Sequence, residues 1–239
     1  MRRFLVAGVA GVLVGVGAAG ALAQSPWPTL SVAPAITPRK AGTRAQPRAA
    51  QLNVQIRWQT LGATSQPIVS ELQILLPKGL YYNGAHVRSC SLAALGAHGP
   101  RGCPTASIVG TGSGSADAYT VIKHPAITIV NGGAGRVYFY TVLDRRAHVQ
   151  APAIGTLTPR SGSWSYRLDV SVPQTLQVVA GVPIALTYLD FSAGKGSWLE
   201  TTACPATRRW PFQVTADYVD PNTGSTGSSV ASGSVPCRK

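Results

Sequence analysis

Three stretches of the chain alternate apolar and polar side chains with a period of two. In residues 52–58 every second side chain, from Leu52 to Trp58, is apolar and those between are polar, and the same alternation recurs in residues 165–172 and 210–218. A period of two is that of a β-strand with one face in a core and the other in water. Weaker strand patterns occur in residues 68–76, 105–112, 119–130, 136–143, 147–157, 184–191, 197–203 and 226–235.

The strand patterns together predict the fold class. About ten short strands, with 26 glycines and 18 prolines marking the turns between them, predict an all-β chain folded as an antiparallel β-sandwich with Greek-key-like connections. We expect residues 51–239 to form this sandwich as one domain; two small β-domains with one disulfide each are the alternative. The one helical candidate is a turn at residues 91–95, capped by Ser89 or Ser91.

The first residues have the pattern of a signal peptide. Arg2 and Arg3 precede an uncharged stretch, residues 4–23, which ends in the small-x-small pattern of Ala21 and Ala23. This pattern predicts cleavage before Gln24, so that residues 1–23 are removed on export and the mature chain is extracellular or held in the cell envelope. The alternative is an uncleaved N-terminal membrane anchor, because twenty apolar residues can span a bilayer.

Residues 24–50 differ in composition from the rest of the chain. They are rich in Pro, Ala and Arg and show no hydrophobic periodicity. Such composition predicts an extended, disordered linker between the signal peptide and the β-domain.

The chain has four cysteines, all after the predicted cleavage site: Cys90, Cys103, Cys204 and Cys237. An even number in an exported chain favours disulfides, and proximity favours pairing the first with the second and the third with the fourth. Zinc is the alternative, but there is no C-x2-C knuckle. We expect neither metal nor cofactor.

Several short motifs suggest a family. Residues 76–80 (LPKGL), residues 89–91 (SCS), residues 103–112 (CPTASIVGTG) and the later Ala-Cys-Pro at 203–205, followed by a Trp-x-Phe strand at 210–212, resemble secreted actinobacterial proteins of unknown function. The resemblance covers most of residues 51–220. It implies export and a β-rich fold, and it implies no activity and no catalytic residues.

The net charge of +13 suggests acidic partners. Within residues 51–239 there are 15 basic and 8 acidic residues, which leaves this part at +7. Such a balance favours an anionic cell-wall polymer or an acidic glycan as partner. The charges form no run of five or more, so we expect no specific nucleic-acid partner, and no membrane partner once the signal peptide is cleaved.

Four residues near the third and fourth cysteines are candidates for a ligand-binding surface: Trp198, Glu200, Arg208 and Arg209. An acidic or a basic side chain beside an aromatic ring can bind a sugar ring or a nucleobase. With no G-x-S-x-G motif and few titratable residues, the sequence indicates a non-catalytic protein with a structural or binding role. A secreted polysaccharide hydrolase that uses Glu200 and a basic binder of anionic wall polymer are the alternatives.

Overall fold

The computed structural model describes residues 27–59, 67–118, 121–143 and 150–239. The predicted signal peptide and its cleavage site at Ala21, Ala23 and Gln24 lie outside the described residues. Among the residues described, no helix is long and apolar enough to cross a membrane.

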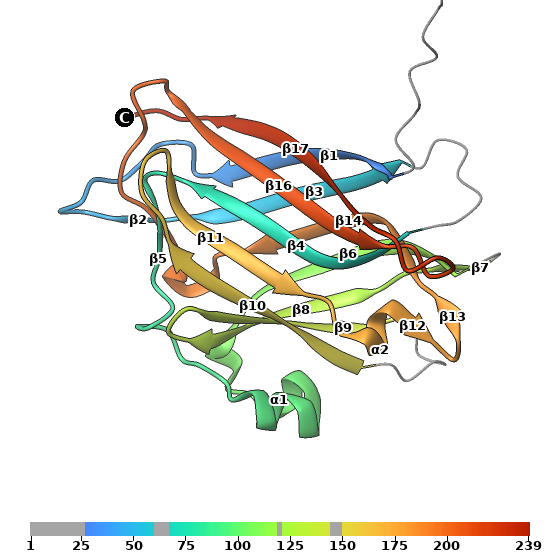
Figure 1. The fold of residues 1–239 in the computed structure, drawn as a ribbon. Coiled ribbons are helices and arrows are strands. Elements are labelled where there is room, and N and C mark those ends of the chain that lie inside the picture. Colours follow the sequence, from blue (N-terminus) through green and yellow to red (C-terminus); the bar gives the residue numbers. More distant parts are fainter. Residues whose placement is uncertain (1–26, 60–66, 119–120, 144–149) are drawn as a thin grey trace, which may run out of the picture.

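Most strands belong to one antiparallel sheet (Figure 1). The strand order is β1-β3-β14-β6-β8-β9-β10-β11-β4-β16-β17, with β7 paired to β6 in addition. The strand bounds are β1 Thr29–Thr37, β3 Gln51–Gln59, β4 Ile68–Pro77, β6 Ile108–Ala118, β7 Val121–Lys123, β8 Ala126–Gly133, β9 Arg136–Val142, β10 Gln150–Pro159, β11 Trp164–Ser171, β14 Ala185–Ala193, β16 Arg209–Val219 and β17 Thr226–Pro236. The all-β, antiparallel prediction is confirmed.

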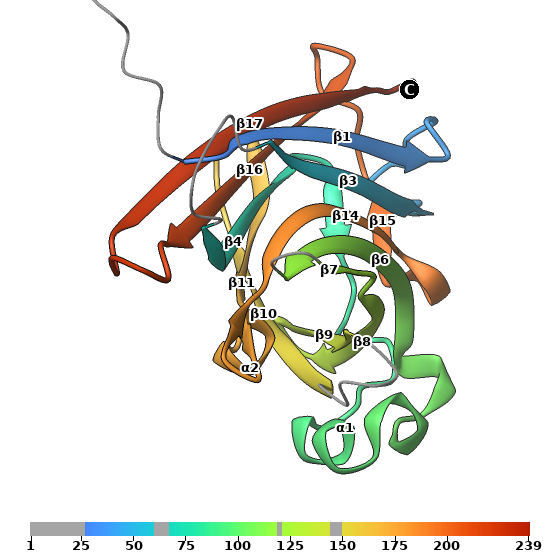
Figure 2. The same ribbon diagram turned by 90° about the vertical axis from the view of Figure 1, so that its right-hand side faces the viewer.

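The connections are of the Greek-key kind. Strands β6, β8, β9, β10 and β11 follow one another as neighbours, and β14 then returns to the free side of β6. Figure 2 shows how the sheet curls, so that β14, β6, β8, β9, β10, β11 and β4 surround a common interior. The two halves of one sheet thus face each other, whereas the sequence suggested only a sandwich of short strands.

The first and last strands of this order, β1 and β17, lie side by side (Figures 1 and 2). Beyond their ends, Lys40 and Arg238 form a parallel bridge, in which the Ala41 N–H donates to the Arg238 carbonyl at 2.9 Å. The disordered-linker prediction for residues 24–50 is therefore wrong where the structure describes this segment, because Thr29–Thr37 pairs along its whole length with β3. Its buried Leu30 and Ile36 supply the energetic reason, which the surrounding prolines and arginines masked.

The alternating stretches of the sequence form the centre of the core. The inward side chains of β3 are buried from Leu52 to Trp58, and those of β16 are buried from Trp210 to Tyr218. Trp210 is 0% exposed. Burial of one face of each strand is what the period of two predicted.

Two smaller sheets and a few short helices complete the fold. The strand order of one small sheet is β2-β15-β5, and the other pairs β12 with β13. The bounds are β2 Arg48–Ala49, β5 Leu80–Tyr82, β12 Val178–Val179, β13 Val182–Pro183, β15 Leu199–Thr201, α1 Leu92–His98 and α2 Gln174–Gln177, with 3-10 helices at Gly99–Gly102, Thr105–Ser107 and Lys195–Ser197. Ser91 caps α1, since its hydroxyl accepts from the Ala94 N–H at 3.1 Å.

Both disulfides form as predicted. Cys90 bonds Cys103 with a Cα–Cα distance of 5.3 Å, and Cys204 bonds Cys237 with a Cα–Cα distance of 5.8 Å. The first closes the loop that contains α1, and the second ties the end of β17 to the segment between β15 and β16.

Candidate ligand-binding groove

A groove of about 400 Å³ lies where β4, β5, β10 and β11 reach one end of the main sheet. The small sheet β2-β15-β5 adjoins it through β5. The groove is lined by basic, aromatic and small residues: Arg44, Lys78, Gly79, Leu80, Tyr81, Pro159, Arg160, Ser161, Gly162, Trp164, Ser165, Tyr166 and Thr202.

The turn between β4 and β5 places Lys78 at the groove. Gly79 has φ of +92°, and a Cβ atom at this position would overlap the Ala203 carbonyl oxygen. Only glycine suits such a position. The Thr202 N–H donates to the Gly79 carbonyl at 2.8 Å and the Lys78 N–H to the Ser163 carbonyl at 2.9 Å. The backbone that carries Lys78 is therefore held from two sides.

The turn between β10 and β11 places Arg160 at the same groove. The Arg160 N–H donates to the Ser165 carbonyl at 2.8 Å, which closes the hairpin. Gly162 supplies the positive φ, +75°, that the turn requires. Both basic side chains of the groove's turns are exposed, as is Arg44 from the segment between β1 and β2.

Three aromatic residues contribute to the same groove. Tyr81 is 43% exposed, and Trp164 and Tyr166 are half-buried. Behind them, the ring of Tyr166 meets that of Tyr82 edge to face at 6.2 Å, and the ring of Tyr82 meets that of Trp198 at 5.3 Å. Burial raises the pKa of Tyr166 above its ordinary value, so this phenol is neutral at physiological pH. The aromatic wall is thus supported by buried rings.

The chemistry of the groove follows from these groups. Cationic side chains attract carboxylate, sulfate or phosphate groups, and exposed aromatic faces offer an apolar surface for ring stacking. Among the described residues that line the groove, none is acidic. Its charge is therefore uniformly positive at the lining.

Trp198, predicted to lie on a ligand surface, is buried in the structure, with 4% exposure. Its indole N–H donates to Asn131 Oδ1 at 3.0 Å. The surface prediction for this residue is wrong, because Trp198 precedes β15 and packs into the core instead of continuing the strand's alternation.

Glu200 lies beside the groove without lining it. In the pairing of β15 with β5 it stands directly opposite Tyr81, and in the pairing with β2 opposite Ala49. Directly opposite side chains in a strand pair share one face of the sheet. Glu200 is therefore close to the exposed ring of Tyr81.

Arg208 and Arg209 are exposed, but at a different place. Arg208 has φ of +54° in the turn before β16, and Arg209 Nε donates to Ser234 Oγ on β17 at 2.8 Å. They flank the Cys204–Cys237 disulfide and, among the described residues, line no part of the groove. The four predicted surface residues thus do not form one site.

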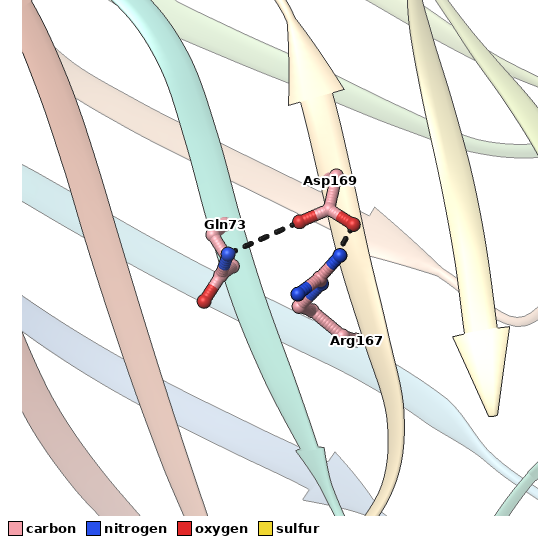
Figure 3. Close-up of polar contacts among 3 residues, drawn as sticks. All are labelled: Gln73, Arg167 and Asp169. Atoms are coloured by element: carbon pink, nitrogen blue, oxygen red, sulfur yellow. Dashed lines mark hydrogen bonds and ion pairs between the residues drawn. The ribbon is translucent and has the colours of Figure 1, made fainter. Parts of the chain in front are cut away.

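A polar cluster on strands β4 and β11 contains a second carboxylate, that of Asp169. Arg167 Nε lies 2.7 Å from Asp169 Oδ2, and Gln73 Nε2 donates to Asp169 Oδ1 at 3.2 Å (Figure 3). Both carboxylate oxygens are engaged by neighbours on the polar face of the sheet. The cluster ties β4 to β11.

The groove residues Lys78, Tyr81, Arg160, Trp164 and Tyr166 were not among the sequence candidates. The sequence feature that could have identified two of them is the pair of Gly- and Pro-containing turns at residues 77–79 and 159–162, because each turn carries a basic residue. The sequence alone does not reveal that the two turns meet.

Comparisons with known proteins give no family. No protein-family model matches the chain, and no curated protein matches it either. Among solved structures it is similar to the major pilin SpaD of Corynebacterium diphtheriae (9% identity, TM-score 0.35, 86% of this chain and 34% of that one) and to the T6 backbone pilin of serotype M6 Streptococcus pyogenes (9%, 0.33, 87% and 36%). It is also similar to the bacterial hydrophobin BslA (12%, 0.32, 90% and 99%).

The chain spans about a third of the length of the two pilins. At these TM-scores and identities the likenesses are too distant to assign a function, and the fold described above rests on the strand pairing itself.

Proposed function

We propose that this chain is an exported, non-catalytic binding protein of the cell envelope or extracellular space, and that its groove holds an anionic polysaccharide. The observation that carries the proposal is the convergence of Arg44, Lys78 and Arg160 with Tyr81 and Trp164 in one groove. Cations without aromatic rings would suit any polyanion, and rings without cations would suit a neutral sugar. The combination favours a polymer that has both sugar rings and acidic groups.

The size of the groove agrees with such a ligand. A volume of about 400 Å³ lies in the range of sites that hold molecules of a few rings. The hydrogen-bonded turns fix the backbone of Lys78 and Arg160 at the groove before binding, so that only their side chains lose freedom when the ligand is bound.

Retention on three polymers tests the proposal. Polygalacturonate offers sugar rings with carboxylates, polyphosphate offers charge alone, and dextran offers rings alone. We expect the purified mature chain to bind polygalacturonate most tightly and dextran least. Binding to polygalacturonate should weaken as salt is raised, because screening shortens electrostatic reach to about 8 Å at physiological ionic strength.

Two variants with a matched control localise the site. Arg160→Ala removes a groove charge, while Arg101→Ala removes the same charge from an exposed position on the 3-10 helix after α1. The first should weaken polygalacturonate binding several-fold and the second should leave it unchanged. Tyr81→Ala should weaken binding to polygalacturonate but not to polyphosphate. Equal losses in the two arginine variants would reduce the interaction to net charge and contradict the proposal.

The position of Glu200 opposite Tyr81 favours polysaccharide hydrolysis as the second candidate. An acid beside a bound glycan can act in glycoside cleavage when a second carboxyl group lies about 5–9.5 Å away. Incubation of polygalacturonate with the mature chain, followed by reducing-end measurement, separates the two functions. Turnover that Glu200→Gln abolishes would establish the hydrolase; we expect intact polymer and unchanged binding by this variant.

A further inference from the structure

Three chain segments meet at the end of the molecule where β17 ends (Figure 1). They are the segment after β1, the start of β16 and the segment after β17. The Arg238 N–H donates to the Arg39 carbonyl at 2.9 Å, and the Cys237 N–H donates to the Arg208 carbonyl at 2.9 Å. The disulfide between Cys204 and Cys237 adds a covalent link. The backbones of the three segments are therefore held side by side.

Each of these segments contributes one cation to a row. Arg209, the first residue of β16, stands directly opposite Pro236 of β17. Arg238 lies two residues beyond Pro236, so Arg209 and Arg238 are diagonal neighbours, about 7–8 Å apart. On its other side Arg238 is bridged to Lys40, at the usual strand spacing of about 4.8 Å. Lys40, Arg238 and Arg209, all exposed, thus form a row about 12 Å long, which we call the basic row.

The positive charge of the basic row is not balanced within the described part of the chain. Arg39 and Arg208 adjoin the row in sequence and are exposed as well. The segments themselves, residues 37–48, 203–212 and 232–239, contain no Asp or Glu. None of the three cations in the row forms an ion pair with a described residue.

Such a row is unfavourable for the chain alone. Like charges directly opposite each other on neighbouring strands destabilise the pairing, and the spacings within the row do not exceed the screening length of about 8 Å at physiological salt. The segments stay together because the Cys204–Cys237 disulfide and the backbone hydrogen bonds hold them. An anion bound from outside the chain would relieve this repulsion.

The side chains of the row suit phosphate groups. Guanidinium groups bind phosphate oxygens in pairs, and a lysine ammonium binds phosphate as a point charge. Arg209 Nε donates to Ser234 Oγ at 2.8 Å, which positions this guanidinium and leaves its two terminal nitrogens for a ligand. The large apolar side chains that are exposed in the described structure, Tyr81, Ile154 and Val230, lie outside the three segments. The row therefore offers charge without a ring for stacking.

We propose that the basic row binds a linear phosphate polymer that lies across the ends of β1, β17 and β16. One phosphate group reaches only part of a row about 12 Å long, whereas a chain of phosphates reaches all three cations. A bilayer surface also presents phosphate groups, but the row has no exposed apolar side chain to enter a bilayer, so the polymer is favoured. The row is separate from the groove, and this proposal does not rest on the proposed function.

The salt dependence of binding to inorganic polyphosphate tests the proposal. Each contact with a single-stranded polyanion contributes about 0.7 to the slope of log K against log salt concentration. The double variant Arg209→Gln with Arg238→Gln removes two contacts, so the slope should become shallower by about 1.4. Binding at low salt should weaken at least about tenfold, because charge-assisted hydrogen bonds are lost.

The double variant Arg88→Gln with Arg101→Gln is the matched control. It removes the same charge from exposed positions on either side of α1, and it should keep the slope and affinity of the unaltered chain. Both double variants made again with Arg160→Ala should show the same difference, which separates this test from that of the groove. Equal losses in the two double variants would reduce the binding to net charge and overturn the proposal.

A measurement on the unaltered chain decides the question if the double variant of the row does not fold. Bound polyphosphate should slow the acetylation of Lys40 several-fold. It should leave the rate unchanged at Lys195, which is exposed on the 3-10 helix before β15. Peptide mass spectrometry gives both rates, and equal protection of the two lysines would contradict the proposal.

Phosphatidylglycerol vesicles distinguish the polymer from a membrane surface. At physiological salt and equal phosphate concentration, we expect the vesicles to leave polyphosphate bound and the chain in the supernatant. Sedimentation with the vesicles that Arg209→Gln with Arg238→Gln abolishes would assign the row to a membrane surface and overturn the proposal of a polymer.

Discussion

Trp198 donates its indole N–H to the side-chain oxygen of Asn131 across 3.0 Å, and both side chains are buried. The two N–H groups of the Asn131 amide lie within 2.9 to 3.1 Å of three carbonyl oxygens, those of Gly84, Val87 and Arg88, so that one N–H is shared between two acceptors. Asn131 lies on β8 of the main sheet. One side chain therefore links the main sheet to the segment after β5 and to the tryptophan beside β15.

Asn131→Ala should lower the free energy of unfolding by about 3 kcal/mol or more. Removal of the amide leaves several buried groups without a partner, and each such group costs about 1–3 kcal/mol. Urea denaturation gives the value. Asn222→Ala, an exposed turn residue, is the control and should stay within about 0.5 kcal/mol of the unaltered chain. A similar value for both variants would contradict a linking role.

The two disulfides should contribute unequally to stability. The chain-entropy estimate is about 3 kcal/mol for the bond across a separation of 13 residues and about 4 kcal/mol for that across 33. The double variant Cys204→Ser with Cys237→Ser should therefore unfold at lower guanidinium concentration than Cys90→Ser with Cys103→Ser. The reverse order would show that the entropic account does not hold here.

Stability should fall as pH rises from about 10 to about 12. Burial raises the pKa of Tyr82 to about 12, and in the unfolded chain a tyrosine titrates near 10. The folded state keeps a proton that the unfolded state loses, so this contribution is complete below pH 10 and is lost by pH 12. Its size is about 2 to 3 kcal/mol.

Tyr82→Phe should remove this part of the alkaline loss, as measured by denaturation at a series of pH values. Tyr81→Phe changes the exposed neighbour and should keep the loss. If the free energy of unfolding of Tyr82→Phe falls between pH 10 and pH 12 as much as that of the unaltered chain, the loss does not come from Tyr82.

Gly79→Ala and Gly96→Ala should have opposite effects. At position 79 the positive φ and the contact with Ala203 make alanine destabilising by about 2 kcal/mol, and displacement of Lys78 should weaken polygalacturonate binding. Position 96 lies within α1 with open space around its Cα, so alanine should stabilise by about 0.5 to 1 kcal/mol. Thermal unfolding measures both, and a neutral Gly79→Ala would mean that the turn is not rigid.

The native chain should lack residues 1–23. The basic start and the Ala-x-Ala pattern at Ala21 and Ala23 predict processing before Gln24. Mass spectrometry of the intact protein, isolated from the producing cells and from their medium, shows whether residues 1–23 have been removed. A full-length species that stays in the membrane fraction would favour the anchor instead.

Local patterns predicted the strands well. The stretch 51–59 is strand β3, residues 164–171 form β11 and residues 209–219 form β16, because half-buried strands must alternate apolar and polar side chains. The disulfide pairing and the cap of α1 were also predicted, since both depend on residues close in sequence. Strand β1 was missed because only Leu30 and Ile36 are fully buried in it.

The candidate site was not predicted. Glu200 was identified, but its neighbour Tyr81 comes from a strand far away in the sequence. Trp198 was predicted to lie on a ligand surface because it stands close to Glu200 in the strand-like stretch 197–203, but the regular strand β15 begins only at Leu199. Alternation defines a face only within a regular strand, so it does not apply where the chain turns.

The sequence by itself determined most of the strands after residue 50, the buried faces of the clearly alternating ones, the local disulfides and the excess of positive charge, because each depends on neighbouring residues and on composition. Tertiary structure alone decided that the turns carrying Lys78 and Arg160 meet, that β1 joins the sheet, and that the curled sheet encloses an apolar space. The physical reason is that strand pairing is non-local: backbone hydrogen bonds are nearly the same for every residue, so which strands pair depends on how all the apolar faces are buried together.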